Sequence, residues 1–160
     1  MVDRVSDIEP ELLKRWGIQG IVLDLDNTIV PWHTADLSDG VAAWVARLRA
    51  DGILFCLLTN NYGRQAAEVA DILSMNIIKG ALKPSPPAFR KALAALGTPA
   101  SASVVIGDQL FTDVLGGKLT GMRAVLVRPI GRKEFPTTAL LRMLEEPIVA
   151  WLRRNEGAKA

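Results

Sequence analysis

The chain has 160 residues, 49% of them hydrophobic and 22% charged, which suits one globular domain and excludes a disordered or a membrane-spanning protein. One cysteine, Cys56, and one histidine, His33, exclude an internal disulfide, a zinc site built on cysteine pairs and a histidine-rich metal site. The net charge is only +2, but residues 1–71 hold 6 basic and 11 acidic side chains, whereas residues 72–160 hold 13 and 6. The basic second half favours an anionic ligand such as a phosphate, a lipid surface or a nucleic acid, although a solvated basic face explains it equally well.

Short apolar runs rich in β-branched residues alternate with segments of helical period along the chain. In chain order, the predicted elements are strand Gly20–Asp26, helix Ser38–Arg49, strand Ile53–Thr59, helix Arg64–Leu73, strand Asn76–Lys79, helix Pro86–Leu96, strand Ser103–Gly107, helix Thr112–Leu119 and strand Ala124–Arg128. Ser85 is the expected N-cap of its helix and Gly97 its end, whereas Gly116 and Gly117 weaken the last helix. Downstream, Thr137–Asn155 is predicted to be a helix that is broken or kinked at Pro147, with Leu144 and Ile148 among its apolar residues.

This alternation predicts the α/β class, with a Rossmann-like five-stranded parallel sheet covered by helices on both faces. The whole chain, residues 1–160, is expected to form one domain. Right-handed crossovers bring the carboxyl ends of all strands to one edge of such a sheet, where ligands bind. Functional residues are therefore expected directly after the strands.

Polar residues lie at the ends of four of the predicted strands or directly after them. They are Asp24 and Asp26, Thr59 with Asn60 and Asn61, Lys83, and Asp108 with Asp113. Neighbouring carboxylates in a crevice are costly without a cation, and an all-oxygen donor set suits Mg²⁺. A hydroxyl and an ammonium group suit phosphate oxygens, while one carboxylate can act as a nucleophile and another as a general acid and base. The pattern indicates phosphoryl transfer.

The segments DLDNT, LLTNN, LKP and GDQLFTD, in this order, resemble the four motifs of the haloacid-dehalogenase-like (HAD) superfamily of phosphatases, over about residues 20–128. The resemblance implies that Asp24 is the nucleophile and Asp26 the general acid and base. It also implies that Thr59 and the Asn60 backbone hold the phosphoryl group and that Lys83 neutralises its charge. The implied cofactor is Mg²⁺, and its implied ligands are Asp24, Asp26 through its backbone carbonyl, Asp108, and Asp113 through water.

Four alternatives accompany these roles. Asp24 alone is also explained by a turn, and Lys83 alone by a solvated position on the surface. Asp113 is also explained by the dipole of its helix, or it orients Lys83. A receiver domain of two-component signalling carries a similar set, but there the lysine comes last, whereas here Lys83 precedes Asp108. The chain order therefore favours the phosphatase.

The spacing between motifs leaves no room for a cap domain, either between Asp26 and Ser38 or between Thr59 and Lys83. We therefore expect an open crevice beside a short flap, Ile29–Asp36, that serves large substrates or borrows a lid from a partner. The segment DNTIVPW, together with GDQLFTD, resembles the capless subfamily IIIA called YqeG-like. That subfamily is related to phosphatases acting on phosphatidylglycerophosphate.

The expected function is Mg²⁺-dependent hydrolysis of a phosphate monoester through an aspartyl phosphate, with phosphatidylglycerophosphate as a substrate. A weakly catalytic phosphate-binding scaffold is the alternative from another class. A nucleic-acid end phosphatase is disfavoured because the chain lacks an aromatic and basic stripe.

The expected location is the cytoplasm, peripheral at the membrane, because the first residues lack the apolar segment of a secretory signal. Trp32 and the basic loop with Arg132 and Lys133 suit an anionic lipid surface, but Trp32 suits packing on the core equally well. His33 is expected to form hydrogen bonds within the flap. The C-terminal helix is expected to cover the sheet rather than to lie on a membrane.

Overall fold

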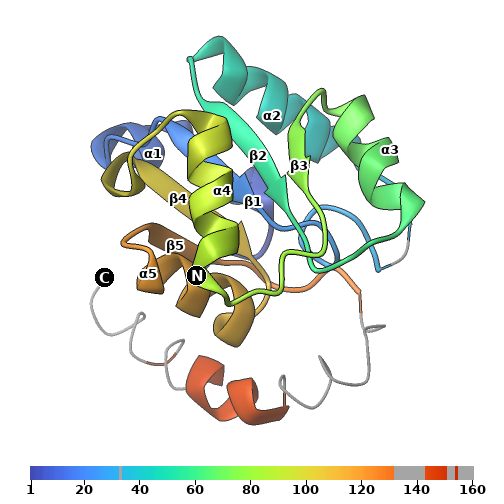
Figure 1. Ribbon diagram of the computed structural model, residues 1–160, viewed down its shortest axis with the longest axis vertical. Coiled ribbons are helices and arrows are strands. Elements are labelled where there is room, and N and C mark those ends of the chain that lie inside the picture. The colour runs from blue at the N-terminus through green and yellow to red at the C-terminus, as the bar shows by residue number, and fades with distance from the viewer. Residues whose placement is uncertain (33, 132–142, 151–153, 155–160) are drawn as a thin grey trace.

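The computed structural model describes residues 1–32, 34–131, 143–150 and 154. Its centre is a five-stranded sheet with the strand order β3-β2-β1-β4-β5 (Figure 1). All neighbouring strands are parallel, which confirms the predicted class. The strands are β1 (Gly20–Leu23), β2 (Leu54–Leu58), β3 (Asn76–Ile78), β4 (Ser103–Gly107) and β5 (Arg123–Leu126).

The helices that connect the strands lie within one or two residues of the predicted ranges, except after β4. They are α2 (Asp39–Ala50), α3 (Arg64–Ile72), α4 (Pro86–Leu96) and α5 (Leu115–Leu119). The Ser38 hydroxyl caps α2 by accepting the Val41 N–H, and α4 ends at Gly97 with a positive φ of 69°. Ser85 holds the N-cap position of α4 but makes no capping bond through its side chain.

Several short elements were not predicted, because each is too brief to show a periodic pattern. They are the 3₁₀ turn η1 (Val5–Asp7), helix α1 (Pro10–Arg15), the 3₁₀ turn η2 (Ala100–Ala102) and the π-helix η3 (Leu110–Val114). The π-helix leads directly into α5, so the predicted helix Thr112–Leu119 begins two residues earlier and with a wider turn.

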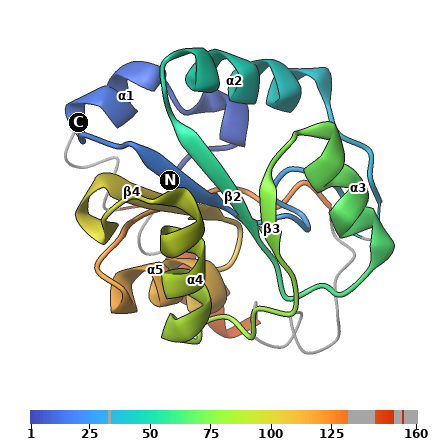
Figure 2. The ribbon, with the colours of Figure 1, turned by 45° about the horizontal axis from the view of Figure 1, so that its top comes forward.

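Helices cover both faces of the sheet, with α2 and α3 on one side and α4 and α5 on the other (Figure 2). A layer of buried hydrophobic side chains lies beneath the helices on each face. Successive residues of each strand point to opposite layers, so Ile21 and Leu23 of β1 join the layer under α2 and α3, whereas Val22 joins the layer under α4. Because both faces of the sheet are buried, nearly every residue of the central strands is apolar. Polar functional groups are therefore expected at the ends of the strands.

The connection after β1 contains no cap domain, as predicted, and its first part is packed rather than loose. Ile29 and Val30 are fully buried, and a bridge pairs Val30 with Asp26. Pro31 and Trp32 are half-buried, which favours the packed alternative for this tryptophan. In the described part of the chain, no helix combines the length and the hydropathy that crossing a bilayer requires.

The C-terminal helix differs from the expectation. Residues 143–150 form a continuous helix without a break at Pro147. Leu144 and Ile148 were expected to cover the sheet, but they are 60% and 41% exposed. The buried residue is Glu145, which contacts the loop after β4. The remainder of the predicted helix Thr137–Asn155, apart from Arg154, lies outside the described residues, as do His33, Arg132 and Lys133.

Candidate active site

The polar residues singled out in the sequence gather at the carboxyl edge of the sheet, as the parallel topology requires. Asp24 follows β1, Thr59 follows β2, and Asp108 follows β4. Asp24, Thr59 and Asp108 are buried, with 5%, 1% and 3% exposure. Such burial of side chains that prefer water indicates that they are held by specific partners.

The Lys83 ammonium group lies between two carboxylates. Its Nζ is 2.5 Å from Oδ1 of Asp24 and 2.6 Å from Oδ1 of Asp113. The Lys83 backbone N–H donates to Oδ1 of Asn60 at 2.7 Å, so the loop after β2 anchors the loop after β3. Lys83 is therefore a part of the site and not a solvated surface lysine.

Burial and charge act in opposite directions on Lys83. Desolvation lowers the pKa of Lys83, but the charges and hydrogen bonds of Asp113 and Asp24 outweigh it and hold this pKa above its ordinary value. Burial raises the pKa of Asp113 to about 6, and the nearby Asp24 adds to the rise although Lys83 opposes it. The site thus retains a permanent cation beside a carboxyl group that is difficult to ionise.

Three buried carboxylates form a cluster that suits a metal ion. Oxygen atoms of Asp24, Asp108 and Asp113 all lie within 4.8 Å of one another. The Thr28 hydroxyl donates to Oδ2 of Asp24 at 2.8 Å and lies 3.5 Å from Oδ1 of Asp108. The three carboxylates carry more negative charge than the single positive charge of Lys83 can balance. Their ligand atoms are all oxygen, so these residues fit a hard divalent cation.

Asp26 directs its carboxylate toward the loop after β2. Nδ2 of Asn61 donates to both Asp26 oxygens, at 3.2 and 3.0 Å, and the Thr59 hydroxyl lies 3.4 Å from Oδ2. Asp26 is also only half-buried. It therefore has the access to solvent and substrate that a general acid requires.

The position of Asp113 depends on a glycine. A Cβ atom added to Gly107 would overlap the Asp113 carboxylate, so only glycine at the end of β4 lets this side chain lie there. Oδ2 of Asp113 accepts the backbone N–H of Gln109 at 3.1 Å, while Oδ1 meets Lys83. Asp113 therefore contacts both the start of its own helical segment and Lys83.

Sequence reasoning assigned no role to three residues that contact the site. Thr28 lies in the motif DLDNT and Asn61 in LLTNN, so their places in these motifs could have indicated that they contact the site. Glu145 lies 34 residues beyond its partner Phe111, and no local pattern marks it.

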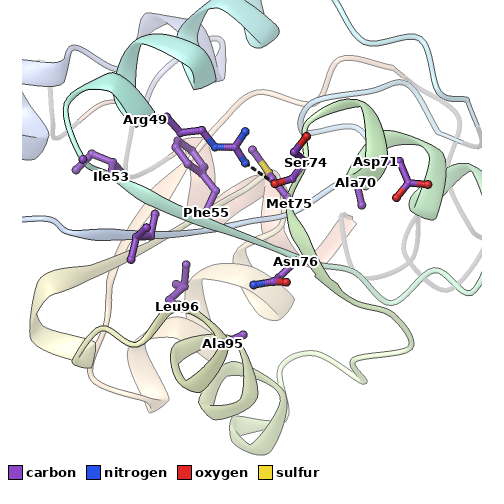
Figure 3. Close-up of a pocket in the computed structure, with 12 residues that line it drawn as sticks. Arg49, Ile53, Phe55, Ala70, Asp71, Ser74, Met75, Asn76, Ala95 and Leu96 are labelled. Atoms are coloured by element: carbon purple, nitrogen blue, oxygen red, sulfur yellow. Dashed lines mark hydrogen bonds between the residues drawn. The ribbon is translucent and has the colours of Figure 1, made fainter.

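Cavities occur at both ends of the sheet. One of about 690 Å³ is lined by Asp108, Arg128, Pro129 and residues of the helix 143–150. Another, of about 790 Å³, lies at the amino ends of β2 and β3 and contains none of the predicted site residues (Figure 3). There the Arg49 guanidinium donates to the Ser74 carbonyl at 2.9 Å and stacks over Phe55, which is a structural use of its charge.

Comparison with known proteins agrees with this geometry. A family model described as HAD-hydrolase-like matches residues 81–133. The chain is 34% identical over 154 residues to the probable phosphatase YqeG of Bacillus subtilis, covering 96% of this chain and 90% of that protein.

More distant similarities cover the chain less evenly. A phosphatidylglycerophosphate phosphatase of Arabidopsis thaliana is 25% identical over 159 residues, covering 92% of this chain but only 46% of that protein. A crystal structure of an uncharacterised protein from Listeria monocytogenes superposes with a TM-score of 0.59 at 16% identity, covering 74% of this chain and 85% of that one. At this identity the superposition shows the shared fold alone.

Proposed function

Because this chain belongs to the HAD-like phosphatases, we propose that it hydrolyses a phosphate monoester through a phosphorylated Asp24, with Mg²⁺ as its metal ion. The observation that carries the proposal is the bridge from Lys83 to Asp24 and Asp113 beside the three-carboxylate cluster. A carboxylate held by an ammonium group is pre-oriented, and its charge is balanced before an anionic substrate arrives.

In the first step, an oxygen of Asp24 attacks phosphorus and the bond from phosphorus to the leaving oxygen breaks. Lys83 and Thr28 each hold one Asp24 oxygen, so the carboxylate is fixed in rotation. Asp26 gives its proton to the leaving oxygen, which departs as an alcohol. Thr59 and Lys83 donate to the oxygens of the phosphoryl group.

In the second step, water attacks the phosphorus of the phosphorylated Asp24. Asp26, now a carboxylate, takes the proton from this water, and inorganic phosphate leaves as Asp24 is regenerated. Asn61 donates to both oxygens of Asp26 and holds the carboxylate in place between the two steps.

Asp24, Asp108 and Asp113 are the side chains that would hold the metal ion, with the Asp26 carbonyl as the further ligand that the family resemblance implies. When bound, Mg²⁺ neutralises the charge that builds up on the transferring phosphoryl group. The test of the covalent step is intact-protein mass spectrometry after rapid acid quenching with a good aryl phosphate. A phosphoryl adduct is expected in the wild type and not in Asp24→Asn; its absence from the wild type under burst conditions contradicts the mechanism.

For the substrate, we propose a lipid phosphomonoester presented at a membrane surface, of the phosphatidylglycerophosphate type. Similarity to the Arabidopsis thaliana phosphatidylglycerophosphate phosphatase supports this proposal. A group of exposed apolar side chains, here called the apolar rim, supports it as well. The rim comprises Tyr62, Leu82 and Ile130, which follow the carboxyl ends of β2, β3 and β5, and Met143, Leu144 and Ile148 of the C-terminal helix.

The apolar rim is unusual for a surface exposed to water, because these side chains are between 41% and 72% exposed. Tyr62, Leu82 and Ile130 follow strand ends at the edge of the sheet that carries the site, and helix 143–150 lines a cavity with Asp108. Exposed apolar groups at such an edge suit protein or membrane contacts. The substrate test compares kcat/KM for phosphatidylglycerophosphate in mixed micelles with kcat/KM for soluble sugar phosphates and nucleotides. A preference for the lipid below tenfold, about 1.4 kcal/mol, would exclude the lipid but not the general phosphatase activity.

A further inference from the structure

Helix 143–150 buries a charged residue and exposes its apolar ones. Glu145 is 3% exposed, whereas Met143 and Leu144 are 70% and 60% exposed. A surface helix normally shows the opposite pattern, and a glutamate is rarely buried without a specific partner. The burial of Glu145 therefore indicates that its carboxylate has a defined role.

The partner of Glu145 is the backbone of the π-helix after β4. The Phe111 N–H donates to Oε1 of Glu145 at 2.7 Å. The first N–H groups of a helical segment have no acceptor within their own segment, and a carboxylate is a strong acceptor for them. The Glu145 carboxylate therefore supplies the acceptor that the Phe111 N–H requires.

Phe111 lies between the two acidic residues of that loop. Asp108 precedes it by three residues and Asp113 follows it by two. Asp113 is fixed further by Lys83 and by the N–H of Gln109. Glu145 itself lines the same cavity as Asp108, so helix 143–150 forms a wall beside the site.

We propose that Glu145 is a positioning residue of the metal site, which holds the segment Asp108–Asp113 in place through the Phe111 backbone. This inference rests on the proposed metal dependence. Glu145 does not contact the reacting atoms, and its carboxylate is not part of the three-acid cluster. Its effect is to keep Asp108 and Asp113 at the spacing that the cation requires, as outer residues around metal ligands do.

The test uses the full chain and three variants. Glu145→Ala removes the acceptor, and Glu145→Gln retains an acceptor oxygen of the same reach but no charge. Glu146→Ala is the matched control, because Glu146 is the neighbouring glutamate and is exposed. The measurements are calorimetric titration with Mg²⁺, amide hydrogen exchange at Phe111 in metal-free protein, and kcat and KM for p-nitrophenyl phosphate.

Glu145→Ala is expected to bind Mg²⁺ about 10- to 100-fold more weakly and to exchange the Phe111 amide faster. Its kcat at limiting Mg²⁺ falls and recovers at saturating Mg²⁺, with KM for the ester unchanged. Glu145→Gln is expected to stay near the wild type, as is Glu146→Ala.

Unchanged Mg²⁺ affinity in folded Glu145→Ala would overturn the inference. If Glu145→Ala does not fold, a Glu145→Gln variant that folds but loses Mg²⁺ affinity overturns it instead. A wild type that binds no divalent cation contradicts the proposed function. In that case the exchange rate of the Phe111 amide still decides whether Glu145 holds the loop.

Discussion

Nζ of Lys83 lies 2.6 Å from Oδ1 of Asp113, so an ion pair joins the loop after β3 to the π-helix after β4. The two residues are 30 positions apart and both are buried. This pair connects Lys83, for which we propose a role in neutralising phosphate charge, with the loop that carries the proposed acidic ligands Asp108 and Asp113. A change in either loop is therefore expected to affect both functions.

Asp24→Asn is expected to abolish turnover of any phosphate ester while the fold is retained. The amide has nearly the shape of the carboxylate but is a poor nucleophile, and it leaves Lys83 with Asp113 as its remaining carboxylate partner. Steady-state hydrolysis of p-nitrophenyl phosphate and a thermal unfolding scan measure the two properties. Wild-type activity in this variant would show that Asp24 is not the nucleophile.

Asp26→Asn is expected to lower kcat by about 10²- to 10⁴-fold, because the leaving oxygen then departs without a proton. Asn61→Leu provides the graded comparison, since it removes the donor that orients Asp26 but keeps the acid. We expect a loss of about tenfold for it, near 1.4 kcal/mol. An aryl phosphate with a good leaving group should reduce the Asp26→Asn defect; an equal defect on all esters contradicts the general-acid role.

Gly107→Ala is expected to displace the Asp113 carboxylate, because the added Cβ would overlap it. Crowding of this kind in a packed site costs about 1–3 kcal/mol of stability. Gly40→Ala is the matched control: nothing lies within 4 Å of a Cβ at this position in the first turn of α2, so no loss of stability is expected. Chemical denaturation measures both values, and equal stability of the two variants would contradict the close approach.

The stability of the metal-free protein is expected to depend on the protonation of Asp113. Its pKa rises from 3.8 to about 6 on folding, so the folded state holds a proton that the unfolded state releases. The resulting stabilisation is complete below pH 3.8 and is lost as the pH rises through about 6, at up to ~1.4 kcal/mol per pH unit.

Urea denaturation in EDTA between pH 4 and 7 measures this dependence. The wild type is expected to lose stability with rising pH relative to Asp113→Asn, which has no proton to release at this position. Added Mg²⁺ favours the ionised carboxylates and should reduce the slope. Parallel pH profiles of the two proteins in EDTA would contradict the raised pKa.

Serine substitutions in the apolar rim are expected to weaken binding to anionic vesicles if the rim meets a lipid surface. Ile130→Ser and Leu144→Ser should each reduce association about fivefold, or ~1 kcal/mol, without changing hydrolysis of a soluble ester. Ile72→Ser at the end of α3 is the control, because Ile72 is 62% exposed but lies outside the rim. Equal loss in all three variants would show that the rim is not the lipid-binding surface.

The alternation of apolar runs and periodic segments determined most of the fold. Strand Ser103–Gly107 and helix Pro86–Leu96 have the bounds that the sequence predicts. The predicted strand Gly20–Asp26 is three residues too long, because β1 ends at Leu23, directly before Asp24 of the site, although the Asp24 N–H still donates to the Ile106 carbonyl at 2.9 Å. Polar residues at strand ends were likewise recognisable, since parallel topology brings every strand end to one edge.

Tertiary packing alone decided the orientation and the partners of these residues. Asp24 and Asp26 are two positions apart, yet Asp24 faces Lys83 while Asp26 faces Asn61. The buried Glu145 reaches Phe111 across 34 residues, and Gly107 makes room for Asp113. Local periodicity indicates which face of a helix or strand is buried, because side chains repeat on one face at a fixed spacing along the sequence. Contacts between distant segments depend on how whole elements pack, and no short stretch of sequence encodes that arrangement.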